Sequence, residues 1–158
     1  FVTIMSSLYH LPDSTRPFAR TNIQTIQQRA EIMAKLLPGG QSVGEICCGD
    51  CQMQAQIYRA QLGVQDYRGL DISAEVVTFN RAHGLDCRQG DALSANAMRP
   101  FLDCGAIFFG PPLSVACDGH RLLTSDQVRP AYRDFVSLLP GELGYQGTLI
   151  CIGIRGTA

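Results

Sequence analysis

An alternation of short strand-like runs with longer amphipathic segments constrains the fold more than any other feature of this sequence. The segments between the runs carry apolar residues every three or four positions, the period of an amphipathic helix. The most strand-like runs are continuously apolar, which is typical of parallel strands buried on both faces. We therefore expect an α/β fold in which a mostly parallel, twisted sheet lies between two layers of helices. The five expected strands are 43–48, 67–72, 85–89, 106–109 and 149–154.

Helix boundaries are marked by caps and breakers. The first helix is expected over 21–37, where Pro38-Gly39-Gly40 stops it. Ser73 is placed to cap a helix over 74–83, and Gly63 is placed to end the one before it. The other expected helices are 52–62, part of 92–102, and a segment with apolar positions from 128 to 139.

Composition favours a single globular domain. The chain has 158 residues, 46% of them hydrophobic, and a formal net charge of -1, so it is too apolar for disorder and carries no long-range field to attract nucleic acid. No apolar run is long enough to span a membrane. We expect one domain over 1–158, with an N-terminal arm and helix in 1–40 and a ligand-binding core in 41–158. Seven cysteines and no signal peptide favour a reduced, cytoplasmic protein.

Acidic residues recur where the expected strands end. Glu45 lies in the first strand, Asp71 closes the second and Asp91 follows the third, while Gly110-Pro111-Pro112 follows the fourth. In an open parallel sheet, ligands bind beyond the carboxyl ends of the strands. Carboxylates repel phosphate, so this pattern favours a ligand with hydroxyls, an amino group or a positive charge.

From Glu45 to Ile154 the sequence resembles the class I S-adenosylmethionine-dependent methyltransferases. The family's turn D/E-x-x-x-G-x-G corresponds to the seven residues from Glu45 to Cys51, although Cys51 stands where a glycine is usual. The resemblance implies a three-layer αβα Rossmann-like sandwich and S-adenosylmethionine as cofactor. It also implies that Asp71 binds the ribose hydroxyls and Asp91 lies near the adenine amino group. The implied cofactor-binding residues are Glu45, Cys47, Gly49, Cys51, Asp71, Ile72, Asp91, Ala92 and Gly110.

Gly110, Pro111 and Pro112 correspond to the family's catalytic turn, N/D-P-P-Y or a relative of it. Two successive prolines make a rigid loop of carbonyl acceptors, which can hold an amino group with its lone pair aimed at the methyl carbon. Gly110 replaces the Asn or Asp of amino-methylating relatives, and Leu113 replaces the nucleophilic Cys of carbon-5 cytosine methyltransferases. The resemblance therefore implies methyl transfer to an unidentified acceptor, with a nitrogen of a nucleic acid or protein as the leading class.

Three other functions are compatible with parts of the pattern. A catalytically inactive protein that binds the cofactor or a partner would explain the departures at Cys51 and Gly110. An NAD-dependent oxidoreductase needs G-x-G-x-x-G, of which only Gly49 is present in this turn. A thiol or metal site on Cys48 and Cys51 with Cys47 would be half of a zinc site.

Each candidate residue also has a purely structural interpretation. Glu45 could bond backbone N–H groups at a strand end, and Asp50 suits a helix cap better than a ligand. Asp71, followed by Ser73, could belong to a cap motif alone, and Asp91 could simply form a Gly-Asp turn. Cys47 and Cys48 could be small apolar residues packed at the end of a strand.

The end of the chain carries a further expectation. The family's sheet has seven strands, whereas the fifth expected strand ends at Ile154 and its C-terminal antiparallel pair is not found. We therefore expect the core to be incomplete at its C-terminus. Alternatively, a second copy or a partner chain pairs with the exposed edge of 149–154.

Overall fold

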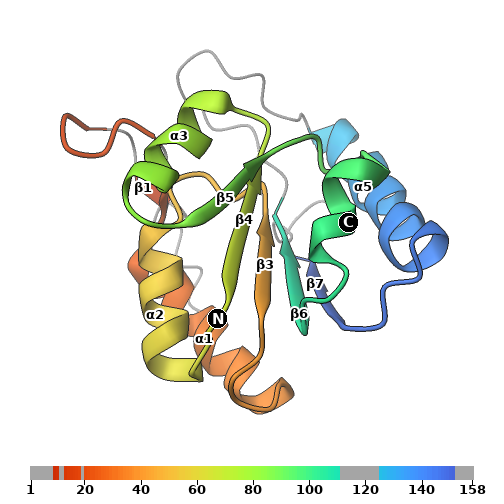
Figure 1. Cartoon of the computed structure of the whole chain (residues 1–158), viewed down its shortest axis with the longest axis horizontal. Helices are drawn as coiled ribbons and strands as arrows, with labels where there is room; N and C mark the ends of the chain where they lie inside the picture. Colours follow the sequence, from red (N-terminus) through yellow and green to blue (C-terminus); the bar gives the residue numbers. More distant parts are fainter. Residues whose placement is uncertain (1–8, 11–12, 19, 111–124, 152–158) are drawn as a thin grey trace.

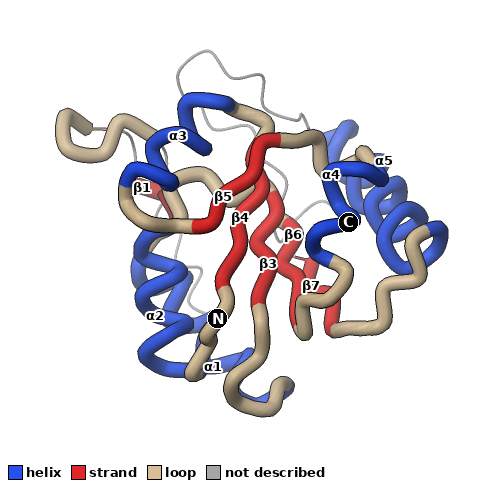
Figure 2. Tube along the Cα trace, viewed as in Figure 1, coloured by secondary structure: helices blue, strands red, loops and turns tan. Residues whose placement is uncertain are grey.

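The computed structural model describes residues 9–10, 13–18, 20–110 and 125–151, and its main feature is a five-stranded parallel sheet. The strands lie in the order β5-β4-β3-β6-β7 (Figure 2), and every adjacent pair is parallel. Their bounds are β3 Val43–Ile46, β4 Tyr67–Asp71, β5 Asp86–Gln89, β6 Ala106–Phe109 and β7 Thr148–Cys151. The expected parallel sheet is confirmed.

Helices cover both faces of this sheet. Figure 1 shows α1, α2 and α3 on one side and α4 and α5 on the other. Each helix layer packs against its face of the sheet through a separate cluster of buried residues, so the αβα sandwich is also confirmed. None of the helices in the described part of the chain is long and apolar enough to cross a membrane. The helices are α1 Ile23–Leu36, α2 Gln52–Leu62, α3 Ala74–Ala82, α4 Ala95–Met98, η1 Arg99–Phe101, α5 Ser125–Val136 and η2 Ser137–Glu142.

The expected caps define α2 and α3. The Ser73 hydroxyl accepts a hydrogen bond from the N–H of Val76 at 3.4 Å, which satisfies one of the free donors at the start of α3. Gly63 takes a left-handed conformation with φ 65° and ends α2. Local sequence thus sets where these two helices begin and end.

Three elements differ from their expected form. The strand expected over 43–48 ends at Ile46, because Cys47 adopts φ 60° and turns the chain out of the sheet. The helix expected within 92–102 is one α-helical turn followed by the 3-10 turn η1, which contains Pro100. The short hairpin of β1 (Tyr9–His10) with β2 (Arg20–Thr21) was not expected, since two-residue strands leave no periodic pattern. Of the strand expected over 149–154, residues 152–154 lie outside the described residues.

The order of the strands places a switch point beside β3. The chain runs outward from β3 to β4 and β5, then returns to β6 on the other side of β3. Ligands of open α/β sheets bind in the crevice at such a point. The N–H of Gly110, just after β6, donates to the carbonyl of Ile46 at 3.4 Å, which holds the two strand ends together.

Candidate functional site

The turn between β3 and α2 forms the centre of the candidate site. Cys47 and Gly49 both adopt left-handed backbone conformations, with φ 60° and 55°. Glycine takes this conformation freely, whereas a residue with a Cβ pays about 1–2 kcal/mol. Strain of this kind concentrates where a ligand is bound or a turn is fixed by its surroundings. The turn over 47–51 is therefore held in shape by other parts of the protein.

Asp71 fixes this turn from the end of β4. Its Oδ2 accepts a hydrogen bond from the N–H of Gly49 at 3.0 Å, and its Oδ1 accepts one from the N–H of Ser73 at 3.0 Å. The residue is half-buried, and an ionised carboxylate has about four acceptor positions, so two stay open to a ligand. The structure thus brings together Gly49 and Asp71, which are 22 positions apart in the sequence.

Asp91 lies near the same opening. Its Oδ1 accepts a hydrogen bond from the N–H of Leu93 at 2.9 Å, so the Gly-Asp turn is present. Burial raises the pKa of the Cys47 thiol to about 12, and the nearby charges of Asp71 and Asp91 add to the effect. The N–H of Gly90 donates to the carbonyl of Asp71 at 3.0 Å, so Asp91, the next residue, lies close to Asp71. The Cys47 thiol is neutral at physiological pH. Ile72 beside Asp71 is strongly exposed, at 68%.

Glu45 lies beneath the turn, on the side of the sheet covered by α1 and α2. Its Oε2 accepts a hydrogen bond from the Tyr67 hydroxyl at 2.6 Å, and its Oε1 lies 3.4 Å from the Arg29 guanidinium. Burial raises its pKa, although Arg29 and the Tyr67 hydroxyl oppose the shift. The Glu45 carboxylate thus contacts two side chains, Tyr67 through a hydrogen bond and Arg29 through an ion pair. Its role in cofactor binding stays a prediction.

The cysteines of the turn lie in different environments. Cys47 is half-buried beside the carboxylates, whereas Cys48 and Cys51 are buried in the core below α3. The Sγ atoms of Cys48 and Cys87 lie 3.7 Å apart above Gly69, where an added Cβ would lie 2.9 Å from the Cys48 Sγ. The described residues hold no group of three His, Cys, Asp or Glu side chains placed to bind a metal ion. The metal site considered from sequence gains no support.

Asn80 supports the turn from α3, and sequence reasoning did not single it out. Its Nδ2 donates to the carbonyl of Gly49 at 2.8 Å, and its Oδ1 accepts from the N–H of Cys51 at 3.4 Å. The residue is fully buried. A signal does exist in the sequence, because Asn80 lies on the same helical face as the buried Val76 and Val77. A polar residue on a core-facing stripe needs a polar partner.

Asp50 completes the turn with an ion pair to the N-terminal arm. Both of its carboxylate oxygens lie 3.2 Å from Nη1 of Arg16, and its side chain is only 1% exposed. Its Oδ1 also accepts from the N–H of Gln52 at 3.4 Å, but the N-cap of α2 is Cys51, so Asp50 lies one residue before the expected capping position. Arg16 lies 34 positions away, so no local pattern could indicate this contact.

The expected catalytic turn is described only at its first residue. Gly110 is half-buried beside the end of β3. Pro111 and Pro112 lie outside the described residues. Their catalytic role is therefore still the one implied by the sequence.

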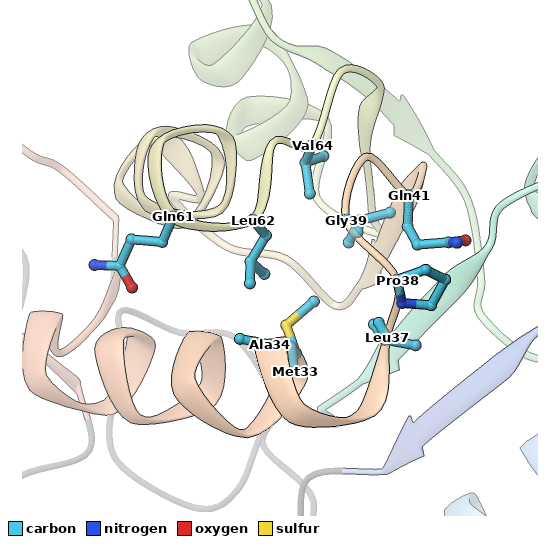
Figure 3. Close-up of a pocket in the computed structure, with 10 residues that line it drawn as sticks. Met33, Ala34, Leu37, Pro38, Gly39, Gln41, Gln61, Leu62 and Val64 are labelled. Atoms are coloured by element: carbon cyan, nitrogen blue, oxygen red, sulfur yellow. The ribbon is translucent and has the colours of Figure 1, made fainter.

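A cavity of about 200 Å³ lies at the other end of the sheet, between the last turns of α1 and α2. Figure 3 shows the side chains that line it, among them Met33, Leu37, Leu62 and Val64. None of its lining residues is titratable, and none belongs to the predicted site. The acid-lined turn after β3 is therefore the better candidate for a functional site.

Comparison with known proteins relates this architecture to solved structures. No protein-family model matches the sequence, and no curated protein matches it significantly. Several solved structures match this chain with probability 1.00, among them DesVI and KedS8. DesVI from Streptomyces venezuelae aligns with a TM-score of 0.52 and 18% identity, over 82% of this chain and 49% of its own. The sugar N-methyltransferase KedS8 from Streptoalloteichus sp ATCC 53650 gives 0.51 and 17%, over 80% and 46%.

This chain has the fold of the class I S-adenosylmethionine-dependent methyltransferases. The chain spans about half the length of the two solved structures. At this level of identity the likeness concerns the methyltransferase fold and not the reaction.

Proposed function

We propose that this protein is a methyltransferase that binds S-adenosylmethionine at the turn after β3 and methylates a nitrogen of a nucleic acid or protein. The observation that carries the proposal is the carboxylate of Asp71. It is bonded to the Gly49 N–H at the switch point of a methyltransferase fold, and Asp91 lies close by. The arrangement places negative charge where a cationic ligand with ribose hydroxyls would be bound.

The residues present suit the chemistry of this cofactor. A carboxylate can accept hydrogen bonds from two vicinal hydroxyls, and such charge-assisted bonds are stronger than neutral ones. Asp71 is already oriented by two backbone N–H groups, so it loses little freedom on binding. The exposed Ile72 next to it offers an apolar surface for a base.

Little acid-base chemistry is required of the protein. When bound, the cofactor supplies a methyl group on a positively charged sulfur that leaves as a neutral thioether. The protein has to hold the acceptor nitrogen in line and exclude water. We assign the acceptor side to Gly110 and to Pro111 and Pro112, whose carbonyls can bind the hydrogens of an amino group. The neutral thiol of Cys47 adds no charge to compete with the carboxylates.

One observation favours the alternative of a protein that binds without catalysis. Cys47 carries a side chain at a left-handed position at the start of the turn, where a glycine would leave more room for a ligand. If the Cys47 thiol keeps the acceptor away from the methyl group, the protein would still bind the cofactor but would not transfer the methyl group. The two functions therefore separate in a transfer assay and not in a binding assay.

Binding is tested first, with S-adenosylhomocysteine and NAD in thermal-shift and calorimetric titrations. We expect stabilisation by S-adenosylhomocysteine alone. Asp71→Ala should weaken its binding by about tenfold or more, since it removes a charge-assisted contact. Asp86→Ala is the matched control, because Asp86 is an exposed carboxylate at the opposite end of the adjacent strand. Stabilisation by NAD alone would overturn the proposal.

Transfer is tested with isotopically labelled cofactor and separate pools of RNA, DNA, protein and amino sugars. Label in RNA, DNA or protein supports the proposed acceptor, and its release by chemistry specific for N-methyl groups identifies the atom. Label in the amino sugars alone would correct the acceptor class. Cofactor binding with no transfer to any pool would favour the inactive alternative.

We further infer a reducing compartment, the cytoplasm, for this protein. The six cysteines in the described part of the chain are all free thiols, which is usual where glutathione keeps cysteines reduced. Alkylation of the native protein from cell extracts, followed by mass spectrometry, checks this inference. Disulfide-linked peptides would contradict it.

We also propose that the outer edge of β7 pairs with another strand, from a second copy or a partner chain. β7 is the outermost strand of the described sheet, and Leu149 and Ile150 within it are half-buried. Unpaired strand edges invite such pairing. Light scattering of the purified protein distinguishes a monomer from a dimer.

A further inference from the structure

The ion pair between Arg16 and Asp50 has a consequence for ligand binding, which rests on the proposed function. We propose that Arg16 is a positioning residue for the cofactor site. Through Asp50 it couples the order of the segment 13–18 to the binding of ligand at the turn 47–51. We call residues 13–18 the strap. The strap is fastened when Arg16 is paired with Asp50, and we expect this pairing when the turn has the shape that the ligand requires.

The strap is built to present Arg16 in a fixed direction. Oδ1 of Asp13 accepts three hydrogen bonds, from the N–H of Thr15 at 2.8 Å, its hydroxyl at 2.6 Å and the N–H of Arg16 at 2.8 Å. These bonds lower the pKa of Asp13. Asp13 and Arg16 also exchange two backbone hydrogen bonds. The backbone at Arg16 is therefore held by its own turn before it reaches the rest of the protein.

Asp50 needs a cation at this position. Its side chain is 1% exposed, whereas that of Arg16 is 26% exposed. A buried carboxylate without a partner is strongly disfavoured, so loss of Arg16 would drive the Asp50 side chain toward solvent. This movement would alter the backbone of the turn.

The neighbours of Asp50 carry this change to the ligand site. Gly49 on one side is bonded to Asp71, and Cys51 on the other side is bonded to Asn80. Asp50 thus lies between the two contacts that shape the turn. A movement at Asp50 would loosen the bond that orients Asp71, the residue we assign to the ribose hydroxyls.

A second contact anchors the strap at α3. The ring of Phe18 packs edge-on against that of Phe79, with centroids 5.4 Å apart. Phe79 precedes Asn80 in α3, so the strap contacts both the turn, at Asp50, and the helix that supports the turn. The position of the strap therefore depends on how the turn and α3 are placed.

Coupling between two sites is reciprocal. If the Arg16–Asp50 pair raises the affinity of the turn for ligand by some factor, bound ligand must raise the equilibrium constant for forming that pair by the same factor. The strap should therefore exchange its amide hydrogens more slowly when ligand is bound. A role confined to overall stability would not produce this reciprocal effect.

The first test compares Arg16→Gln with Arg20→Gln. Arg20 is a matched control, because its side chain is as exposed as that of Arg16, at 26%, and pairs with Asp13 at 3.8 Å instead of with Asp50. We expect Arg16→Gln to raise the Kd for S-adenosylhomocysteine by about tenfold, mainly through faster dissociation. Arg20→Gln should change the Kd by less than about twofold. Equal effects of the two variants, or no effect of Arg16→Gln, would overturn the proposal.

Hydrogen exchange followed by mass spectrometry tests the reciprocal effect. In the wild type, ligand should slow exchange within 13–18, and in Arg16→Gln this slowing should be lost. Slowing that persists in Arg16→Gln would overturn the proposal. Asp50→Asn keeps an acceptor for the N–H of Gln52 and removes the charge, so it should reproduce the effect if Arg16→Gln folds poorly.

The same measurement separates this inference from the proposed function. If the wild type does not bind S-adenosylhomocysteine, the proposed function fails, while exchange without ligand still tests the strap. Faster exchange over 47–52 in Arg16→Gln than in Arg20→Gln would support the link between strap and turn. Unchanged exchange there would overturn it.

Discussion

The two faces of the sheet are packed in different ways. On the face covered by α4 and α5, the buried cluster is almost entirely apolar, with the rings of Phe109 and Phe135 stacked 3.9 Å apart. On the face covered by α1 to α3, the cluster surrounds buried polar and charged groups. In the described part of the chain, the buried polar residues all belong to β2, β3, α2, α3 or the turns beside them. They are Thr21, Glu45, Asp50, Gln54, Ser73 and Asn80.

This difference shows how the molecule separates stability from site geometry. Apolar packing is non-directional and supplies stability wherever shapes match. Buried hydrogen bonds and ion pairs add less net stability, but they specify position because an unmatched partner is costly. The α4–α5 face therefore supports the sheet, while the α1–α3 face fixes the turn at which we place the ligand.

The largest expected effect is on the apolar face. Phe135→Ala removes a fully buried ring and should lower the free energy of unfolding by about 3–5 kcal/mol, measured by urea denaturation. The Kd for S-adenosylhomocysteine should stay within about twofold of wild type under conditions where the variant is folded. Val136→Ala is the control, since this neighbour is 43% exposed. A large loss of ligand affinity would break the proposed separation of roles.

A smaller loss of stability with a larger loss of affinity is expected on the polar face. Asn80→Ala leaves the carbonyl of Gly49 and the N–H of Cys51 without their partner, which should cost about 1–3 kcal/mol. Because the turn loses its support, the affinity for S-adenosylhomocysteine should also fall. Thr78→Ala, on the exposed side of the same helix, is the control. Wild-type affinity in Asn80→Ala would show that Asn80 does not shape the site.

The smallest effect is a pH dependence from Glu45. Burial raises its pKa, so the folded protein holds this proton more tightly than the unfolded chain does. The stability from protonated Glu45 is complete below its ordinary pKa of 4.5 and is lost as the pH rises through the folded-state value. Glu45→Gln cannot titrate, so the wild type should lose stability relative to this variant as the pH rises above 4.5.

Urea denaturation at several pH values measures this difference. Glu31→Gln, which alters an exposed carboxylate of α1, should show no comparable trend. A wild type that gains stability over Glu45→Gln as the pH rises would contradict the prediction. In that case the Arg29 ion pair would outweigh the cost of burial.

Sequence was a good guide to the elements and a poorer guide to contacts between them. Ser73 and Gly63 act through bonds within a few residues, so their roles as caps could be predicted. Glu45 was expected among the cofactor ligands, which stays a prediction, but its contacts with Tyr67 and Arg29 could not be read from the sequence. The face of the sheet on which a strand residue lies depends on how the two helix layers pack against the strand. A continuously apolar sequence pattern does not indicate which face that is.

The sequence alone determined the alternation of strands and helices, the acidic strand ends and the resemblance to methyltransferases. These follow from local periodicity and from the spacing of a few residues along the chain. Tertiary structure decided that Asp71 bonds to Gly49, that Asn80 supports the turn, and that Arg16 reaches Asp50. Such contacts join residues 22 to 34 positions apart, so they depend on the direction in which each element leaves the sheet.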